Sequence, residues 1–200
     1  MEEIKPRYEY RIWGESLAAI HEKLERLAPP KKTASQEIYL ISAITDKCNA
    51  KIRAVLLDVK VLVKESEGLE QWEPILKEGF PLESSVIATQ LFLSLGLSLP
   101  TLERSVYTLS EFLGEVVRRE PQITLVEVSK TRYQFSVGAC AAEYTQVTFN
   151  GLPRETVAVE SVDPEAVFRL VRRLDIGGVN TSYVREMKRV LGLTARLDRT

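Results

Sequence analysis

The stretch Arg7-Tyr8-Glu9-Tyr10-Arg11-Ile12-Trp13 alternates between charged and apolar side chains from Arg7 to Ile12. Successive side chains of a β-strand point to opposite faces, so this period of two predicts a strand. One face would carry the two arginines and the glutamate, and the other would carry the two tyrosines and the isoleucine. Gly14 follows as the end of the strand. The chain therefore opens with a strand that has one charged face, and the same pattern returns further along.

Other segments also have the composition and alternation of strands. They cover residues 37–41, 49–55, 58–64, 124–135, 141–149 and 156–160. Three of these segments place bases on one face, namely Lys51 and Arg53, Lys60 and Lys64, and Lys130 and Arg132. Asn150-Gly151 is a good turn dipeptide, and it predicts a hairpin between the last two strands. The segment from Gly68 to Pro81 contains Pro74 and is expected to be a loop.

Helical patterns separate the strands. Apolar residues recur at helical spacing from Leu17 to Leu27, and Pro29-Pro30 ends that helix. Residues 84–95 and 109–119 are apolar on most sides and predict buried helices. Asp163-Pro164 is typical of a helix start, and a last helix is expected from Thr181 or Ser182 to Gly192. These elements predict an α+β fold in a single domain over residues 1–200, with its core at about residues 7–192.

Composition limits the classes of function. The chain has 200 residues, 44% of them hydrophobic, which is enough for one proper core. Its 27 Lys and Arg balance 28 Asp and Glu, so no overall charge draws it to DNA or to an anionic membrane. A single histidine excludes a multi-histidine zinc site. Two widely spaced cysteines, and an N-terminus without the apolar run of a signal peptide, predict a cytoplasmic protein without disulfides.

The charged strand faces are the candidate functional feature. They are mostly basic, with Arg7, Arg11, Lys51, Arg53, Lys60, Lys64, Lys130 and Arg132. An antiparallel sheet with one face in water also carries charges, and that explanation suffices for any single strand. A solvated sheet would normally mix signs, however, because like charges opposite each other are destabilising. Basic faces on several strands therefore point to a bound anion.

The carboxylates on comparable faces lie far apart in sequence, at Glu9, Glu37, Glu143 and Glu160. If the sheet closes into a barrel, these side chains could meet inside it. Oxygen ligands of this kind suit a hard divalent cation such as Mg²⁺ or Mn²⁺. Arg and Lys side chains would then neutralise phosphate groups, and the metal ion would polarise phosphorus.

With these residues, the chain resembles the CYTH domains of the triphosphate tunnel metalloenzyme superfamily. The family includes class IV adenylate cyclases, thiamine triphosphatases, inorganic triphosphatases and fungal RNA triphosphatases. The resemblance covers about residues 8–192. It is carried by Lys51-Ile52-Arg53, Leu62-Val63-Lys64, Lys130-Thr131-Arg132-Tyr133, Val157-Ala158-Val159-Glu160-Ser161 and Asn180-Thr181-Ser182-Tyr183. It implies a closed antiparallel β-barrel, or tunnel, of about eight strands with helices packed outside.

The resemblance also implies roles for residues. Glu9 and Glu160 would be catalytic residues and ligands of Mg²⁺ or Mn²⁺, and the strand faces alone add Glu37 and Glu143 to this metal set. The resemblance implies phosphate contacts at Arg11, Lys51, Arg53, Lys64, Lys130 and Arg132, and the charged strand faces add Arg7 and Lys60 to the expected substrate contacts. The family signature Glu-x-Glu-x-Lys reads Arg7-x-Glu9-x-Arg11 here, and the usual late Glu-x-Glu reads Ala158-x-Glu160. Two expected metal-binding carboxylates are therefore missing.

Three functional hypotheses follow. The first is a metal-dependent hydrolase that cleaves tripolyphosphate or an organic triphosphate held in a basic tunnel. The second is a tunnel that binds a nucleotide or polyphosphate anion without turnover, as a sensor or interaction module. The third is a structural domain whose charged strands are merely solvated. The expected partner is a small triphosphate or polyphosphate, and a homodimer is compatible with the sequence.

Overall fold

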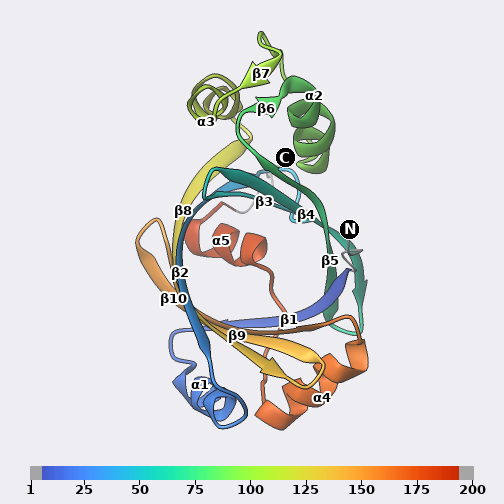
Figure 1. Ribbon diagram of the computed structural model, residues 1–200, viewed down its shortest axis with the longest axis vertical. Helices are drawn as coiled ribbons and strands as arrows, with labels where there is room; N and C mark the ends of the chain where they lie inside the picture. The colour runs from blue at the N-terminus through green and yellow to red at the C-terminus, as the bar shows by residue number, and fades with distance from the viewer. Residues whose placement is uncertain (1–5, 194–200) are drawn as a thin grey trace, which may run out of the picture. The chain divides into compact units, whose positions relative to one another are not determined.

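Eight strands of the computed structural model, which describes residues 6–193, close into an antiparallel barrel (Figure 1). The strand order is β1-β10-β9-β8-β2-β3-β4-β5. The barrel strands are β1 (Arg7–Gly14), β2 (Lys31–Ser42), β3 (Cys48–Arg53), β4 (Leu56–Ser66), β5 (Leu69–Gly79), β8 (Ile123–Val137), β9 (Cys140–Phe149) and β10 (Leu152–Ser161). The predicted α+β fold with a closed barrel is confirmed.

The remaining elements are short apart from three helices. Those three are α1 (Ala18–Glu25), α4 (Pro164–Leu174) and α5 (Tyr183–Leu191). The shorter ones are α2 (Ser84–Val86), η1 (Ile87–Phe92), α3 (Leu109–Glu111), η2 (Phe112–Val116), η3 (Val117–Arg119) and a small sheet of β6 (Leu82–Glu83) and β7 (Val106–Tyr107). Within residues 6–193, none of the helices is long and apolar enough to span a bilayer.

The prediction of a loop between Gly68 and Pro81 is wrong, because Leu69–Gly79 within this segment forms β5. Two neighbouring residues, Leu69 and Glu70, are both buried, so the strand starts without the alternation that identifies strands in a sequence. Pro74 also reads as a strand breaker. It lies beyond the stretch in which β5 pairs with β1, which runs from Glu70 to Trp72. The missed segment is the strand that completes the barrel.

The chain divides into two compact units, each built from separate segments. The first comprises residues up to Gln36, Leu62–Glu73 and Glu127–Ser182, and the second comprises Glu37–Val61, Pro74–Val126 and the residues from Tyr183 onward. The expectation of a single domain over residues 1–200 stays a prediction.

In the first unit, β1, β8, β9 and β10 present one apolar face to the helices α1 and α4. Figure 1 shows both helices beside these strands. The core there includes Ile12, Phe135, Tyr144, Val157, Val159, Val167, Leu170 and Leu174. The Asp163 side chain accepts a hydrogen bond from the Glu165 backbone N–H and caps α4, as the Asp-Pro pair predicted. Since the helices cover this face from outside, the alternate side chains of the same strands point into the barrel.

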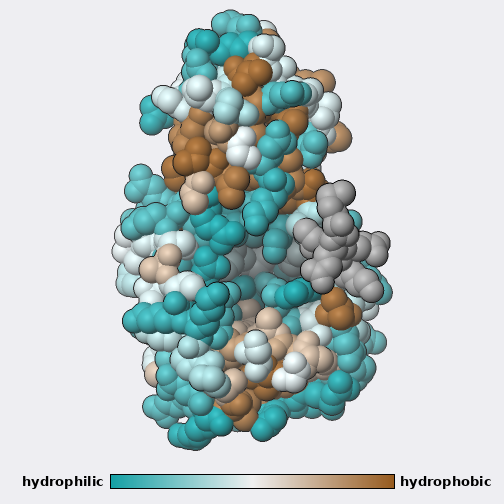
Figure 2. Space-filling model, in the orientation of Figure 1, coloured by the Kyte–Doolittle hydropathy of each residue, from teal (hydrophilic) through white to brown (hydrophobic). Residues whose placement is uncertain are grey.

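The second unit has a separate core. The apolar face of β3 and β4, with Ala50, Ile52, Leu57 and Val59, packs with η1 and η2. Several apolar residues of this unit are nevertheless exposed, including Leu93, Leu99 and Val106. Figure 2 shows apolar residues gathered on the surface of the segment that carries α2, β6 and β7. The charged residues of this unit lie on the opposite face of β3 and β4.

Candidate functional site

Register brings predicted charged residues of the first unit onto one face. Arg11 lies opposite Ala158 on β10, and Ala158 lies opposite Glu143 on β9. Glu143 in turn lies opposite Gln134, two residues from Arg132 on the same face of β8. Residues directly opposite each other in a ladder share a face. Residues far apart in sequence are therefore neighbours on the face that the helices leave uncovered.

Arg11 is the centre of this charged face. Only 6% of the residue is exposed. Its Nε donates to Glu9 Oε1 at 2.9 Å, and its Nη1 donates to Thr156 Oγ1 at 3.2 Å. The same Nη1 lies 3.7 Å from Glu143 Oε1. The guanidinium thus links β1, β9 and β10 on the charged face.

Glu143 lies between two guanidinium groups. Arg11 approaches one of its oxygens at 3.7 Å, and Arg132 Nη1 approaches the other at 4.0 Å. Neither distance is a hydrogen bond, and the carboxylate instead accepts one from Thr145 Oγ1 at 2.8 Å. Arg132 also donates from Nη2 to Ser35 Oγ at 3.1 Å. Lys130 is buried two residues from Arg132 on the same face of β8.

A second ion pair joins β1 to β10 on the same face. Arg7 Nη1 donates to Glu160 Oε1 at 2.9 Å. The Arg7 side chain is 55% exposed and that of Glu160 is 33% exposed, so this pair is much better solvated than Arg11. Both expected catalytic carboxylates, Glu9 and Glu160, are therefore paired with arginine.

The second unit holds another group of predicted residues on β2, β3 and β4. Glu37 lies opposite Arg53, and Lys51 lies opposite Asp58. The fully buried Glu37 carboxylate is 3.7 Å from Lys51 Nζ and 3.7 Å from Arg53 Nη1. Arg53 Nη2 is also 3.8 Å from Asp58. Lys51 lies over the ring of Tyr39, with Nζ 5.7 Å from the centroid.

Burial lowers the pKa of Lys51 from its ordinary value, and this is the largest influence on it. The carboxylates of Glu37 and Asp58 act in the opposite direction, while Lys60 and Arg53 add to the lowering. Lys60 is half-buried and lies opposite Asn49. Lys64, in the first unit, is exposed on β4. Among the predicted phosphate contacts, Lys64 and Arg7 are thus exposed, and burial gives no support for either.

The donor set does not suit a resident Mg²⁺ or Mn²⁺ ion. Of the four predicted ligands, Glu9 and Glu160 each accept a hydrogen bond from an arginine, and Glu37 and Glu143 each lie between two cations. Within residues 6–193, no group of three or more Asp, Glu, His or Cys side chains has an arrangement that could hold a metal ion. Hard divalent ions need several oxygen ligands that are not already neutralised. The metal site stays a prediction that this arrangement does not support.

Two residues of the charged region were missed by the sequence argument. Glu70 is buried on β5 and lies opposite Glu9, and its Oε2 accepts from Trp72 Nε1 at 3.0 Å. Recognising β5 as a strand would have revealed it. Asn180 fixes the backbone around Glu9 and Arg11. Its Oδ1 accepts from Arg11 N at 2.8 Å, and its Nδ2 donates at 2.9 Å to both Glu9 O and Gly68 O. No pattern in the sequence signals such side chain to backbone bonds.

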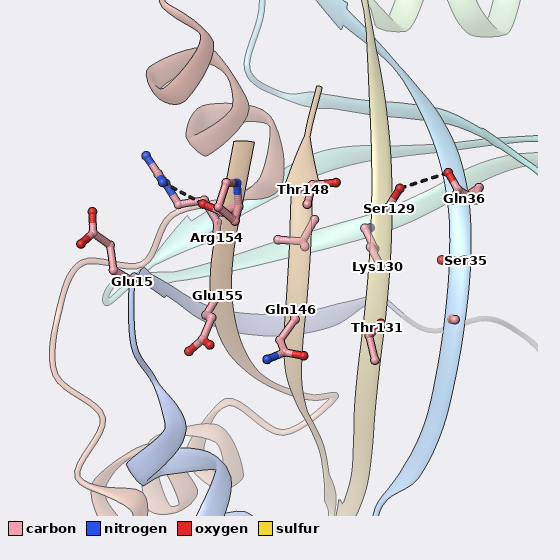
Figure 3. A pocket seen from close by; sticks show the side chains of 13 residues that line it. Glu15, Ser35, Gln36, Ser129, Lys130, Thr131, Gln146, Thr148, Arg154 and Glu155 are labelled. Carbon is pink, nitrogen blue, oxygen red and sulfur yellow. Dashed lines mark hydrogen bonds between the residues drawn. The ribbon is translucent and has the colours of Figure 1, made fainter. Parts of the chain in front are cut away.

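The first unit also has a pocket of about 800 Å³, which is lined mostly by residues that were not predicted as site residues (Figure 3). Its floor includes Thr131, Gln146 and Glu155, which lie opposite one another on β8, β9 and β10. This row is one residue out of step with Arg132, Thr145 and Thr156, so it faces the other way. Of the predicted site residues, Lys130 alone lines this pocket. The cavity is therefore distinct from the charged face.

Comparison with known proteins supports the fold. No protein-family model matches the chain, and no curated protein matches its sequence. Among solved structures, the PH1819 protein from Pyrococcus horikoshii is 17% identical, with a TM-score of 0.51 over 92% of this chain and 99% of that one. The PH1012 protein of the same organism is 11% identical, with a TM-score of 0.52 over 90% and 98%. A conserved hypothetical protein from Pyrococcus furiosus is 13% identical, with a TM-score of 0.51 over 90% and 97%. Identities this low establish likeness of fold alone.

The lowered pKa of Lys51 predicts a pH-dependent stability. Between that lowered pKa and the ordinary value of 10.5, the unfolded chain binds more protons, so the burial penalty falls as pH rises. Lys51→Met removes this penalty. The free energy of unfolding of Lys51→Met, minus that of wild type, should be largest near neutral pH and should decrease as pH approaches 10.5. Urea unfolding at a series of pH values measures this, with the exposed Lys47→Met as control. A difference that does not change with pH would contradict the assignment.

Proposed function

We propose that this chain, which has the triphosphate-tunnel fold its sequence predicted, binds a condensed phosphate anion on the charged faces of its strands. The ligand class is a tripolyphosphate or the triphosphate group of a larger molecule. In the first unit the proposed contacts are Arg7, Arg11, Lys130 and Arg132. The second unit holds a separate candidate group, Lys51, Arg53 and Lys60.

The distances between cations and carboxylates on these faces support this proposal most strongly. Five cation–carboxylate approaches on these faces measure 3.7 to 4.0 Å: Arg11 and Arg132 to Glu143, Lys51 and Arg53 to Glu37, and Arg53 to Asp58. The carboxylates balance the charge without accepting hydrogen bonds at these distances. Guanidinium forks have a geometry that matches phosphate oxygens, so an anion on these faces would meet cations already grouped beside balancing carboxylates.

The energetic cost of burial supports the same proposal. Buried ion pairs seldom stabilise a fold more than well-packed apolar residues of similar volume would. Arg11 and Lys130 are both at least nine-tenths buried. A barrel needs no such residues for strand pairing, so an anion that contacts these two cations accounts for their presence.

A second candidate is the metal-dependent hydrolase of a triphosphate-containing substrate. Glu9 and Glu160 lie directly opposite each other on β1 and β10, which places two carboxylates side by side. If Mg²⁺ or Mn²⁺ displaced their arginine partners, these residues would hold it near the phosphates. The ion would supply Lewis-acid activation of a phosphoanhydride. Anion binding ranks first because Arg7 and Arg11 are themselves anion-binding groups, whereas a metal ion would have to displace them from Glu160 and Glu9.

Ligand binding is tested by thermal unfolding with increasing tripolyphosphate. A ligand that binds only the folded state raises the melting temperature. We expect such a rise with wild type, and we expect added NaCl to reduce it because the interaction is electrostatic. Arg132→Gln and Arg53→Gln should each weaken it. Arg173→Gln, an exposed arginine on α4, is the matched control. No rise at any ligand concentration would refute the proposal.

Glu143→Gln should separate stability from binding. The carboxylate balances Arg11 and Arg132, so the neutral amide leaves two like charges facing each other and lowers the free energy of unfolding by about 1–3 kcal/mol. The same change removes a competing anion, so affinity for tripolyphosphate should increase. Chemical denaturation and calorimetric titration measure the two effects. Weaker binding by Glu143→Gln would show that this carboxylate takes part in ligand contact.

Turnover is tested by phosphate release from tripolyphosphate and ATP with Mg²⁺, Mn²⁺ or EDTA. The anion-binding proposal expects no release under any of these conditions, although the melting temperature still rises. Release that depends on the metal ion, and is lost in Glu160→Ala, would instead establish the hydrolase. Release retained in Glu160→Ala would point to a contaminating phosphatase.

A further inference from the structure

We propose that the anion binds as the metal-free species, with the guanidinium of Arg7 standing where the family resemblance places a metal-binding carboxylate. This inference rests on the proposed anion binding and adds the form of the ligand. It comes from the disagreement between the implied Mg²⁺ or Mn²⁺ site and the contacts of the residues that would form it.

The starting point is a row of carboxylates across three neighbouring strands. Glu9 on β1 lies opposite Glu160 on β10 and opposite Glu70 on β5. The three therefore share the charged face, and all three come from the first unit. Like charges opposite each other in a sheet are destabilising, so this row requires donors or cations close by.

The chain itself supplies one partner for each member of the row. Arg7 Nη1 donates to Glu160 at 2.9 Å, and Arg11 Nε donates to Glu9 at 2.9 Å. A second nitrogen of Arg11, Nη2, lies 3.4 Å from the other oxygen of Glu9. Trp72 Nε1 donates to Glu70 at 3.0 Å. Two guanidinium groups thus balance the charge of Glu160 and Glu9, and an indole N–H donates a hydrogen bond to Glu70.

Binding of a divalent ion at this row would break more favourable contacts than it would form. It would have to displace Arg7 from Glu160 and Arg11 from Glu9, leaving Arg11, which is 6% exposed, without its closest carboxylate. Breaking a buried charged pair is strongly unfavourable. Arg7 would remain nearby as a like charge. Compared with the family signature, Arg7 on β1 therefore removes a carboxylate and places a cation at the same position.

A site of this kind selects between two forms of the ligand. Mg²⁺ bound to a condensed phosphate occupies its oxygens and reduces its negative charge. Guanidinium groups need those oxygens free and that charge intact. Arg7 is 55% exposed, so it can rotate toward an entering anion while Glu160 stays solvated. Excess Mg²⁺ should therefore compete with the protein for the ligand, whereas at a metal-dependent site it would strengthen binding.

The test is calorimetric titration of the whole chain with tripolyphosphate, in EDTA and again in excess Mg²⁺. For wild type we expect binding in EDTA and weaker apparent affinity in Mg²⁺. Arg7→Gln removes one cation, so its affinity in EDTA should fall by about tenfold or more while still requiring no metal. Arg7→Glu returns a carboxylate to the row, so its binding in EDTA should be lost and then restored by Mg²⁺. Arg173→Glu, the same charge reversal on the exposed side of α4, should behave as wild type does.

The outcomes separate this inference from the proposed function. Binding by wild type only in the presence of Mg²⁺, or at least tenfold tighter in Mg²⁺ than in EDTA, would overturn the metal-free inference and leave anion binding intact. Absence of binding in both buffers would overturn the proposed function, and the inference with it. If Arg7→Glu does not fold, the comparison of EDTA with Mg²⁺ on wild type and Arg7→Gln still decides the question.

Discussion

The antiparallel pairing of β1 with β10 is the constraint on which the rest of the first unit depends. It sets Glu9 opposite Glu160 and Ile12 opposite Val157. Because side chains alternate along a strand, a slip of one residue would move every charged residue of β1 to the helix-covered face. The same register thus fixes both the apolar surface under α4 and the ion pairs on the other side. Asn180 reinforces it by holding the backbone of Glu9 and Arg11.

Burying charged residues on these strand faces costs free energy, and strand pairing does not require it. Their cations lie near carboxylates, yet several of these approaches are too long for hydrogen bonds, so these carboxylates balance charge without binding the cations directly. The lowered pKa of Lys51 has the same origin, since burial penalises its charge more than Glu37 and Asp58 favour it. Residues held in this state gain from an anion that supplies both charge and acceptor oxygens. This makes binding the simplest function for the arrangement.

Sequence patterns predicted the strands and the sides on which their charges lie, because alternation is a local property. Residues such as Arg11 and Lys51 were assigned correctly to charged strand faces for that reason. Alternation did not reveal β5, whose buried Leu69 and Glu70 are adjacent. Nor could it specify the partners of each charge. The contact between Arg11 and Glu143 depends on pairing between strands more than a hundred residues apart, and the hydrogen bonds of Asn180 end on backbone atoms.

Arg7 stands where the family signature that the sequence resembles has a carboxylate, and the barrel forms with an arginine there. Strand pairing uses backbone atoms, so it tolerates either side chain at a position that is half exposed. The charge of the row is less tolerant, because Glu9, Glu70 and Glu160 lie side by side and need a compensating cation. The guanidinium groups of Arg7 and Arg11 supply that charge from within the chain. Under the proposed binding, a metal ion at the row would meet the added positive charge of Arg7, so the side chain at position 7 decides which cation balances the row.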